Sequence, residues 1–208
     1  MRSEKIHLKS GGKDVSKILE LIESFSYELD LDDRNMLRIR LLGEELVGLV
    51  NSMDLEFDAE FWMEYDNVDV MLHLDLRTLV NPARKKEFLA LSKSDPKKPK
   101  GIMARIKGIV QNMMVSIDEA DQLQLASTQG VPYAMYGMMD AESSRVIDSA
   151  MVWSLQRYRS SVDQNVKNDE EAITGHDDLE KSVIANIADD VSVGIKDSRV
   201  SLVVTKKL

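Results

Sequence analysis

Apolar residues recur at helical spacing over the first quarter of the chain. Ile6 and Leu8 alternate with charged residues, which predicts a short edge strand ahead of the glycine pair at 11–12. The spacing that follows predicts a helix over about 14–29, and then a longer helix that begins near 32–33, where two acidic residues favour a helix N-terminus. The apolar stripe of this long helix consists of Ile39, Leu42, Leu46, Leu49, Val50 and Met53.

Two glycines lie inside the long helix. Gly43 and Gly48 each cost up to about 1 kcal/mol relative to alanine in a helix interior. We therefore expect these positions to mark close packing against a neighbouring element or a ligand.

The period of the pattern then changes from about 3.6 to 2. Residues 57–65 alternate between apolar and polar side chains, and 68–74 alternate again after the Asp-Asn pair at 66–67. This arrangement predicts an antiparallel hairpin with one buried face. A second hairpin is predicted at the end of the chain, where 191–195 and 200–204 alternate in the same way.

The middle of the chain has a weaker pattern. We predict, in order, a short helix at 82–92, a lysine-rich loop at 93–101, a helix from about 102 to 114, a turn at 130–132, a helix at 143–160, a polar connection at 161–176 and a helix at 177–190. Helices interleaved with hairpins predict an α+β fold. We expect a two-layer α/β sandwich, with helices over one face of a mixed, mostly antiparallel sheet.

The composition excludes several classes of site and partner. The chain has 208 residues and no cysteine, which excludes disulfides, cysteine-bound zinc and thiol nucleophiles. Its formal charge of −9 argues against broad binding to nucleic acid or to anionic membranes, because such binding requires surplus Lys and Arg. No apolar run approaches the ~18 residues of a membrane span, and the first residues have no signal-peptide core. We therefore expect a soluble, cytoplasmic protein.

The sequence lacks the motifs of several common enzyme classes. It has no nucleophile elbow, P-loop, dinucleotide fingerprint or zinc-protease helix. The segment HDDLE at 176–180 combines an imidazole with carboxylates, and we interpret it as a cap at a helix start rather than a metal site. The twelve methionines are typical of core packing, and clustered methionines also suit adaptable protein-binding surfaces.

Two segments carry a resemblance to a known family. They are LRIRLLGEELVGLVNSM at 37–53 and SVIANIADDVSVGIKDSRVSLVVTKKL at 182–208. Together with the order of the elements, they resemble the GHKL ATPase fold that DNA gyrase and histidine kinases share, in particular its anti-sigma-factor serine-kinase branch. The first segment is similar to the family's second helix, whose acid acts in catalysis or water positioning and whose asparagine holds magnesium. The C-terminal segment is similar to the closing helix and two strands. The resemblance implies one ATPase-like domain over 1–208 with Mg-ATP as cofactor.

The resemblance assigns the acid to one of two neighbouring glutamates. Glu45 flanks the apolar stripe whereas Glu44 faces away from it, so Glu45 is the better candidate for the catalytic acid. The family's asparagine follows its acid by four residues, where this chain has Leu49. Asn51 is then the nearby residue that can supply the missing oxygen ligand. On the simpler interpretation, both glutamates are solvated acids on an amphipathic helix.

The remaining nucleotide residues are assigned in the same way. Asp75 stands for the aspartate that contacts the adenine amino group, although the glycines expected after it are absent from the whole of 51–100. Lys100 and Gly101 resemble the family's phosphate-binding lid, since they precede a helix N-terminus, which favours anions. The simpler interpretations are that Asp75 is a turn former at a strand end and that the lysines belong to a solvated loop.

Two alignments of the later part of the chain remain open. Either the helix at 101–115 is the family's post-lid helix and the remainder is an extension, or the helix at 177–190 is the post-lid helix and 78–176 form a large insertion. We favour the second alignment, because the helix at 177–190 runs directly into a hairpin, as the family's does.

The resulting functional hypothesis is a cytoplasmic regulator that acts through protein–protein contact. The resemblance implies a partner of the sigma-factor or anti-anti-sigma type, and the missing ligand and glycines imply weak or lost ATP binding. If the site were active, the reaction would be that of an ATP-dependent serine/threonine protein kinase or ATPase. The alternative hypothesis is a non-enzymatic interaction or structural module with no nucleotide site.

Overall fold

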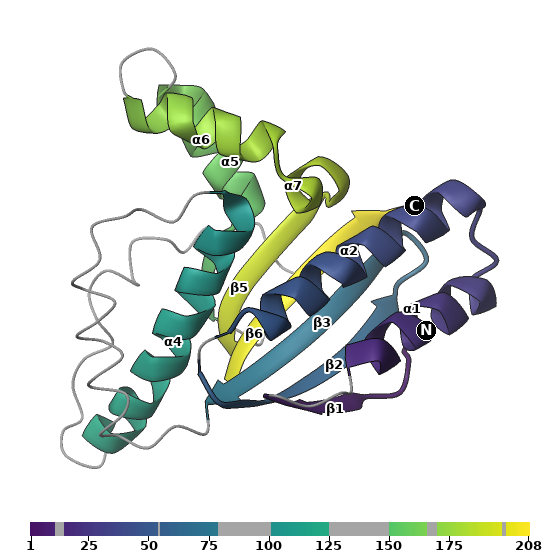
Figure 1. Ribbon diagram of the computed structural model, residues 1–208, viewed down its shortest axis with the longest axis horizontal. Helices are drawn as coiled ribbons and strands as arrows, with labels where there is room; N and C mark the ends of the chain where they lie inside the picture. The colour runs from purple at the N-terminus through teal and green to yellow at the C-terminus, as the bar shows by residue number, and fades with distance from the viewer. Residues whose placement is uncertain (11–14, 54, 79–100, 125–149, 166–169, 197–198) are drawn as a thin grey trace.

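A computed structural model describes residues 1–10, 15–53, 55–78, 101–124, 150–165, 170–196 and 199–208 (Figure 1). Within these residues, six helices pack on an open sheet of six strands, so the α+β prediction is confirmed. The predicted helix at 82–92, the loop at 93–100 and the turn at 130–132 lie outside the described residues.

The sheet consists of two central hairpins with an added strand on each side. Its strands are β1 (Ile6–Lys9), β2 (Phe57–Tyr65), β3 (Asp69–Thr78), β4 (Ala150–Ser154), β5 (Asp190–Lys196) and β6 (Arg199–Lys207), in the order β1-β2-β3-β6-β5-β4. The predicted edge strand and both predicted hairpins are confirmed. A mixed sheet is not found among these strands, since every neighbouring pair is antiparallel.

The first hairpin closes through the Asp-Asn pair. The side-chain oxygen Oδ1 of Asp66 accepts hydrogen bonds from the backbone N–H groups of Val68 at 3.1 Å and Asp69 at 2.9 Å. Asn67 has φ +75°, a left-handed conformation that Asn tolerates better than most residues. The turn chemistry of these two residues therefore sets the register between β2 and β3.

The helices are α1 (Val15–Glu28), α2 (Asp33–Asn51), α4 (Ile102–Gln124), α5 (Leu155–Asn165), α6 (Glu170–Glu180) and α7 (Val183–Ile187). Figure 1 shows α1 and α2 lying across one face of the sheet. Asp32 caps α2, because its side chain accepts the N–H of Asn35 at 2.7 Å. The long helix therefore begins where the two acidic residues predicted it.

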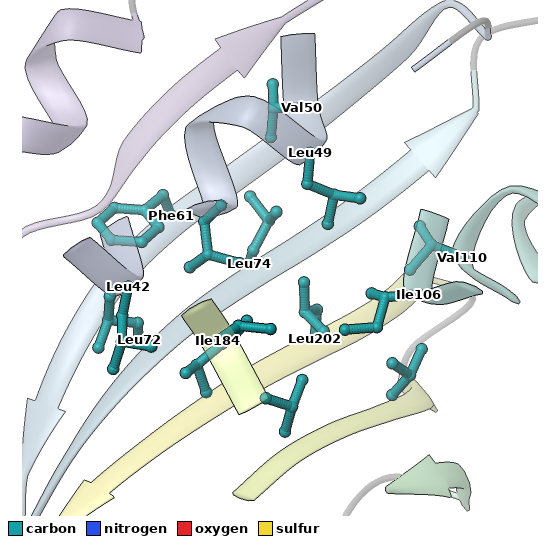
Figure 2. Packing of buried hydrophobic residues seen from close by; sticks show 14 of the residues in the cluster. Leu42, Leu49, Val50, Phe61, Leu72, Leu74, Ile106, Val110, Ile184 and Leu202 are labelled. Carbon is teal, nitrogen blue, oxygen red and sulfur yellow. The ribbon is translucent and has the colours of Figure 1, made fainter. Parts of the chain in front are cut away.

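The core lies between the apolar stripe of α2 and alternate residues of the central strands. Figure 2 shows leucines from α2 above leucines from β3. The fully buried members of this contact include Leu42 and Leu46 on α2 and Leu72, Leu74 and Leu76 on β3. A single continuous core therefore joins the long helix to the centre of the sheet.

Helix α4 belongs to the same core. Ile106 and Val110 are fully buried and lie near Leu202 of β6 (Figure 2). Part of the segment 78–176 thus packs directly on the sheet, although the alignment that we favour treats it as an insertion.

The glycine at position 43 lies where α1 and α2 pack closely, as expected. A Cβ atom at this position would overlap with the side chain of Ile22 on α1. Gly48 differs, because a Cβ there would have no atom within 4 Å. Packing within the chain therefore accounts for Gly43 and not for Gly48.

The predicted helix at 143–160 is wrong for 150–154 and confirmed for 155–160. Residues 150–154 form β4, which pairs with β5, and only then does α5 begin. A short apolar run fits a strand and a buried helix equally well, so its period cannot distinguish them. Pairing with β5 decides in favour of the strand.

The boundaries of the next elements were also wrong. Instead of a polar connection at 161–176, α5 continues to Asn165 and α6 starts at Glu170. Instead of one helix at 177–190, α6 ends at Glu180, and α7 starts after Ser182, whose hydroxyl accepts the N–H of Ala185 at 3.3 Å. The polar helix α6 packs closely at Gly175, where a Cβ would lie 3.0 Å from the side chain of Tyr158.

Candidate functional site

Glu45 lies on the flank of α2, half-exposed, between the buried stripe and the solvent side. Burial raises the pKa of its carboxyl group above the ordinary value. A raised pKa is typical of a carboxyl group that acts as a general base, but it also arises wherever a carboxylate is partly desolvated. Partial burial on the flank of α2 is sufficient to explain the raised pKa of Glu45.

Asn51 is the last residue of α2 and is exposed. It follows Glu45 by six residues, which corresponds to a rotation of about 120° around the helix axis. The two side chains therefore point in different directions and do not converge on one ligand.

Leu49 is the residue to which the resemblance assigns the family's magnesium ligand. Its side chain is 2% exposed and belongs to the hydrophobic core (Figure 2). A leucine has no oxygen to offer a cation, and core side chains surround this one. The packing of Leu49 is thus that of an ordinary core residue.

Asp75 lies within β3 and not at its end, so its interpretation as a strand-end turn former is wrong. It is paired with Glu60 of β2 and Ser201 of β6, and the strand continues to Thr78. Adjacent residues of a strand point to opposite faces of the sheet. Since Leu74 and Leu76 are part of the core beneath α2, the side chain of Asp75 lies on the other face of the sheet.

Gly101 precedes α4, and Lys100 lies outside the described residues. Gly101 has φ +86°, a left-handed conformation that favours glycine, and its carbonyl accepts the N–H of Arg105 at 3.1 Å. This geometry starts the helix and explains the glycine without a ligand.

The segment HDDLE lies in the last turns of α6 and not at a helix start, which corrects the predicted cap. His176 and Glu180 are 3.3 Å apart, and Lys181 donates to Asp177 at 2.8 Å. Both contacts join residues four apart at the C-terminal end of α6. Among the described residues, no group of three or more potential ligands is arranged to hold a metal ion.

A cluster that the sequence does not point to lies on the same face of the sheet as Asp75. The rings of Trp62 and His73 are stacked, with centroids 4.7 Å apart and planes 3° apart. The Nζ atom of Lys5 lies 4.4 Å from the centroid of the Trp62 ring, and the indole N–H donates to Glu64 at 3.0 Å. The stack joins β2 to β3 and Lys5 reaches Trp62 from just before β1, so the register of the sheet brings these groups together. The bond between Trp62 and Glu64 lies within β2.

The neighbouring row of this face carries ion pairs. Lys5 donates to Glu60 at 2.6 Å, and this hydrogen bond lowers the pKa of Glu60. Arg199 of β6 lies 3.8 Å from both Glu60 and Asp58. The side chains of these ion pairs are partly exposed.

Comparisons with known proteins find no match: no family model, no curated protein and no solved structure resembles this chain significantly. In the described part of the chain, no helix is both long enough and apolar enough to cross a bilayer.

Proposed function

We propose that this protein is a regulator of the anti-sigma-factor, serine-kinase-like type that acts through protein–protein contact and has lost the ATP site of that fold. The order of elements supports the resemblance, since it includes two helices, a hairpin, further helices and a terminal hairpin. On this proposal the architecture is the two-layer sandwich of the GHKL ATPases.

The burial of Leu49 carries the proposal that the ATP site is lost. Magnesium bound to ATP requires oxygen ligands in nearly octahedral geometry, and in this family an asparagine of the second helix supplies one. In this chain that position is occupied by a core leucine. A shift of the nucleotide towards Asn51 does not repair the site, because Asn51 and Glu45 lie about 120° apart on the helix.

The position of Asp75 adds a second, independent argument. The acid of the long helix and the adenine-binding aspartate must both face the bound nucleotide. Here Glu45 belongs to the helical layer, whereas Asp75 lies on the opposite face of the sheet. A function through protein–protein contact does not require Glu45 and Asp75 to face the same ligand.

The loss of the nucleotide site is tested by thermal unfolding with Mg-ATP and Mg-ADP at about 5 mM. Binding at 100 times the dissociation constant stabilises a protein by about 2.7 kcal/mol, which raises the midpoint of a chain of this size by several degrees. We expect a shift below about 1 °C. A clear shift with Mg-ATP that Asp75→Asn abolishes would restore the kinase-like hypothesis.

The regulatory part of the proposal needs a separate test. Purified sigma factors and anti-anti-sigma proteins from the same genome are titrated against the full chain by calorimetry, in buffer without nucleotide. We expect one of them to bind, with an affinity that added Mg-ATP does not change. If none binds, the partner class is wrong, and the non-enzymatic module without this partner becomes the better hypothesis.

A further inference from the structure

The solvent side of α2 carries another stripe, which we call the outer seam. It consists of Leu37, Leu41, Glu44 and Gly48. Their spacing of four, three and four residues is that of the contact seam between paired helices. At 100° per residue, the outer seam lies roughly 160° around the axis from the buried stripe. It therefore points away from the sheet, on the outer side of the helical layer.

The outer seam is accessible in the folded chain. Leu37 is 56% exposed, one of the few large apolar side chains with such exposure, and Leu41 is half-buried. Glu44 and Gly48 are exposed. A single exposed leucine is common on protein surfaces. Leu37 differs from such a leucine because it lies on the same line as Gly48, an exposed glycine in the interior of the same helix.

Leu37 and Gly48 are complementary in shape. Leu37 projects from the helix, and Gly48 leaves an open site where a Cβ would have no atom within 4 Å. The two residues are eleven positions apart, so they lie within about 20° of the same direction and about 16 Å apart along the axis. A two-fold axis between Leu41 and Glu44 therefore brings Leu37 of each copy opposite Gly48 of the other.

The charges beside the outer seam agree with an antiparallel pair. Arg38 and Glu45 flank the outer seam on the same side, seven residues apart. Residues on the same flank meet across an antiparallel helix pair, and such pairs set orientation. Neither side chain takes part in an ion pair within the described part of the chain. Arg38 of one copy can thus pair with Glu45 of the other, and the symmetry forms this pair twice.

Glu44 of one copy lies opposite Leu41 of the other, and its charge is compatible with this arrangement. Glu44 is held by Arg40 at 3.2 Å along the same helix, and Arg40 also binds Glu23 of α1. Its carboxylate is therefore directed to the flank, and its aliphatic stem is left to cover Leu41 of the partner copy.

We propose that two copies of this chain associate through the outer seam, with their α2 helices antiparallel and Leu37 of each copy packed on Gly48 of the other. A contact between a single pair of helices buries less than the roughly 1,200 Å² of a standard interface, so the dimer belongs to the weak, transient class. The proposal does not depend on nucleotide binding or on the identity of another partner.

Sedimentation equilibrium of the full chain, from about 1 to 300 µM, tests the proposal. We expect the mass to rise with concentration from 23.5 kDa towards twice that value. Leu37→Asp and Gly48→Gln are expected to weaken the association at least tenfold. Val68→Asp is the matched control, since Val68 is also 56% exposed but lies in the β2–β3 turn. We expect the association constant of this variant to equal that of the native chain.

A charge exchange tests the orientation of the pair. Arg38→Glu places two carboxylates opposite each other and weakens association, and the double variant R38E/E45R restores it. Circular dichroism of every variant confirms that it is folded. A monomer at the highest concentration overturns the proposal, and so does a dimer that L37D and G48Q leave intact. Failure of R38E/E45R to restore association contradicts the antiparallel arrangement and overturns it as well.

Discussion

A Cβ atom added to Gly43 of α2 would lie 2.2 Å from Cδ1 of Ile22 on α1, closer than any real contact permits. Ile22 is 1% exposed and has little room to move. The glycine therefore allows the first two helices to approach each other over the sheet. There is no room for a side chain at Gly43, on the side of the long helix that faces α1. Gly48, five residues later, faces open space.

The two glycines of α2 should respond oppositely to alanine. Gly43→Ala forces Ile22 out of its position and should lower the free energy of unfolding by about 1–3 kcal/mol, the usual cost of overpacking. Gly48→Ala should raise it by up to about 1 kcal/mol, because alanine favours the helix. Urea unfolding at micromolar protein concentration measures both without interference from self-association. Equal destabilisation by the two variants would contradict this assignment.

The buried stripe of α2 predicts the cost of truncating its side chains. Leu46 is fully buried, and Leu46→Ala should lower the free energy of unfolding by about 2–5 kcal/mol. Glu44 is exposed and forms an ion pair with Arg40, so Glu44→Ala should change the free energy of unfolding by about 0.5 kcal/mol or less. A large loss for Glu44→Ala together with a small one for Leu46→Ala would mean that the helix is rotated.

Arg159 of α5 holds the end of α7. Its guanidinium donates hydrogen bonds to the carbonyl oxygens of Ala185, Ala188 and Asp189, the last two at 3.3 and 3.2 Å. Arg159→Ala leaves these carbonyls without their donor and should lower the free energy of unfolding by about 1–3 kcal/mol. Gln156→Ala, on the exposed side of the same helix, is the control and should stay within about 0.5 kcal/mol. Guanidinium unfolding of the two variants makes the comparison.

Asp189 should make stability depend on pH in the acid range. Burial by itself raises the pKa of its carboxyl group, but the hydrogen bonds from Lys206 Nζ at 2.6 Å and the Lys207 N–H at 2.7 Å outweigh burial and lower this pKa overall. A lowered folded-state pKa stabilises the protein above the unfolded value of about 3.9. That contribution is lost as the pH falls through the folded-state pKa.

The corresponding variant is Asp189→Asn. At pH 7 it should lower the free energy of unfolding by about 1 kcal/mol, since the pair is partly exposed and water screens it. The difference from the native chain should close as the pH falls below about 4. Thermal unfolding from pH 3 to 7 measures this, with Asp163→Asn on exposed α5 as the control. A difference that does not narrow at all between pH 7 and pH 3 would show that the charge of Asp189 is not the cause.

Local patterns predicted those elements whose stability depends on near neighbours in the chain. The hairpin β2–β3 was predicted because its alternation and its Asp-Asn turn agree, and both are local properties. The long helix was predicted from its stripe and from the two acidic residues at 32–33, and Asp32 is the residue that caps it. The strand β4 was missed because 150–154 pair with β5, some forty residues later in the sequence. No pattern within β4 itself records that pairing.

The candidate site shows the same division. The sequence alone determined that residue 49 is an apolar leucine and that no glycine lies between Asp75 and position 101. Only the tertiary structure decided that Leu49 is a core residue and that Asp75 and Glu45 lie on different faces of the sheet. The physical reason is the two-residue period of a strand. A shift of the register by one residue moves every side chain of the strand to the other face of the sheet. Only the pairing of β3 with β2 and β6 sets that register.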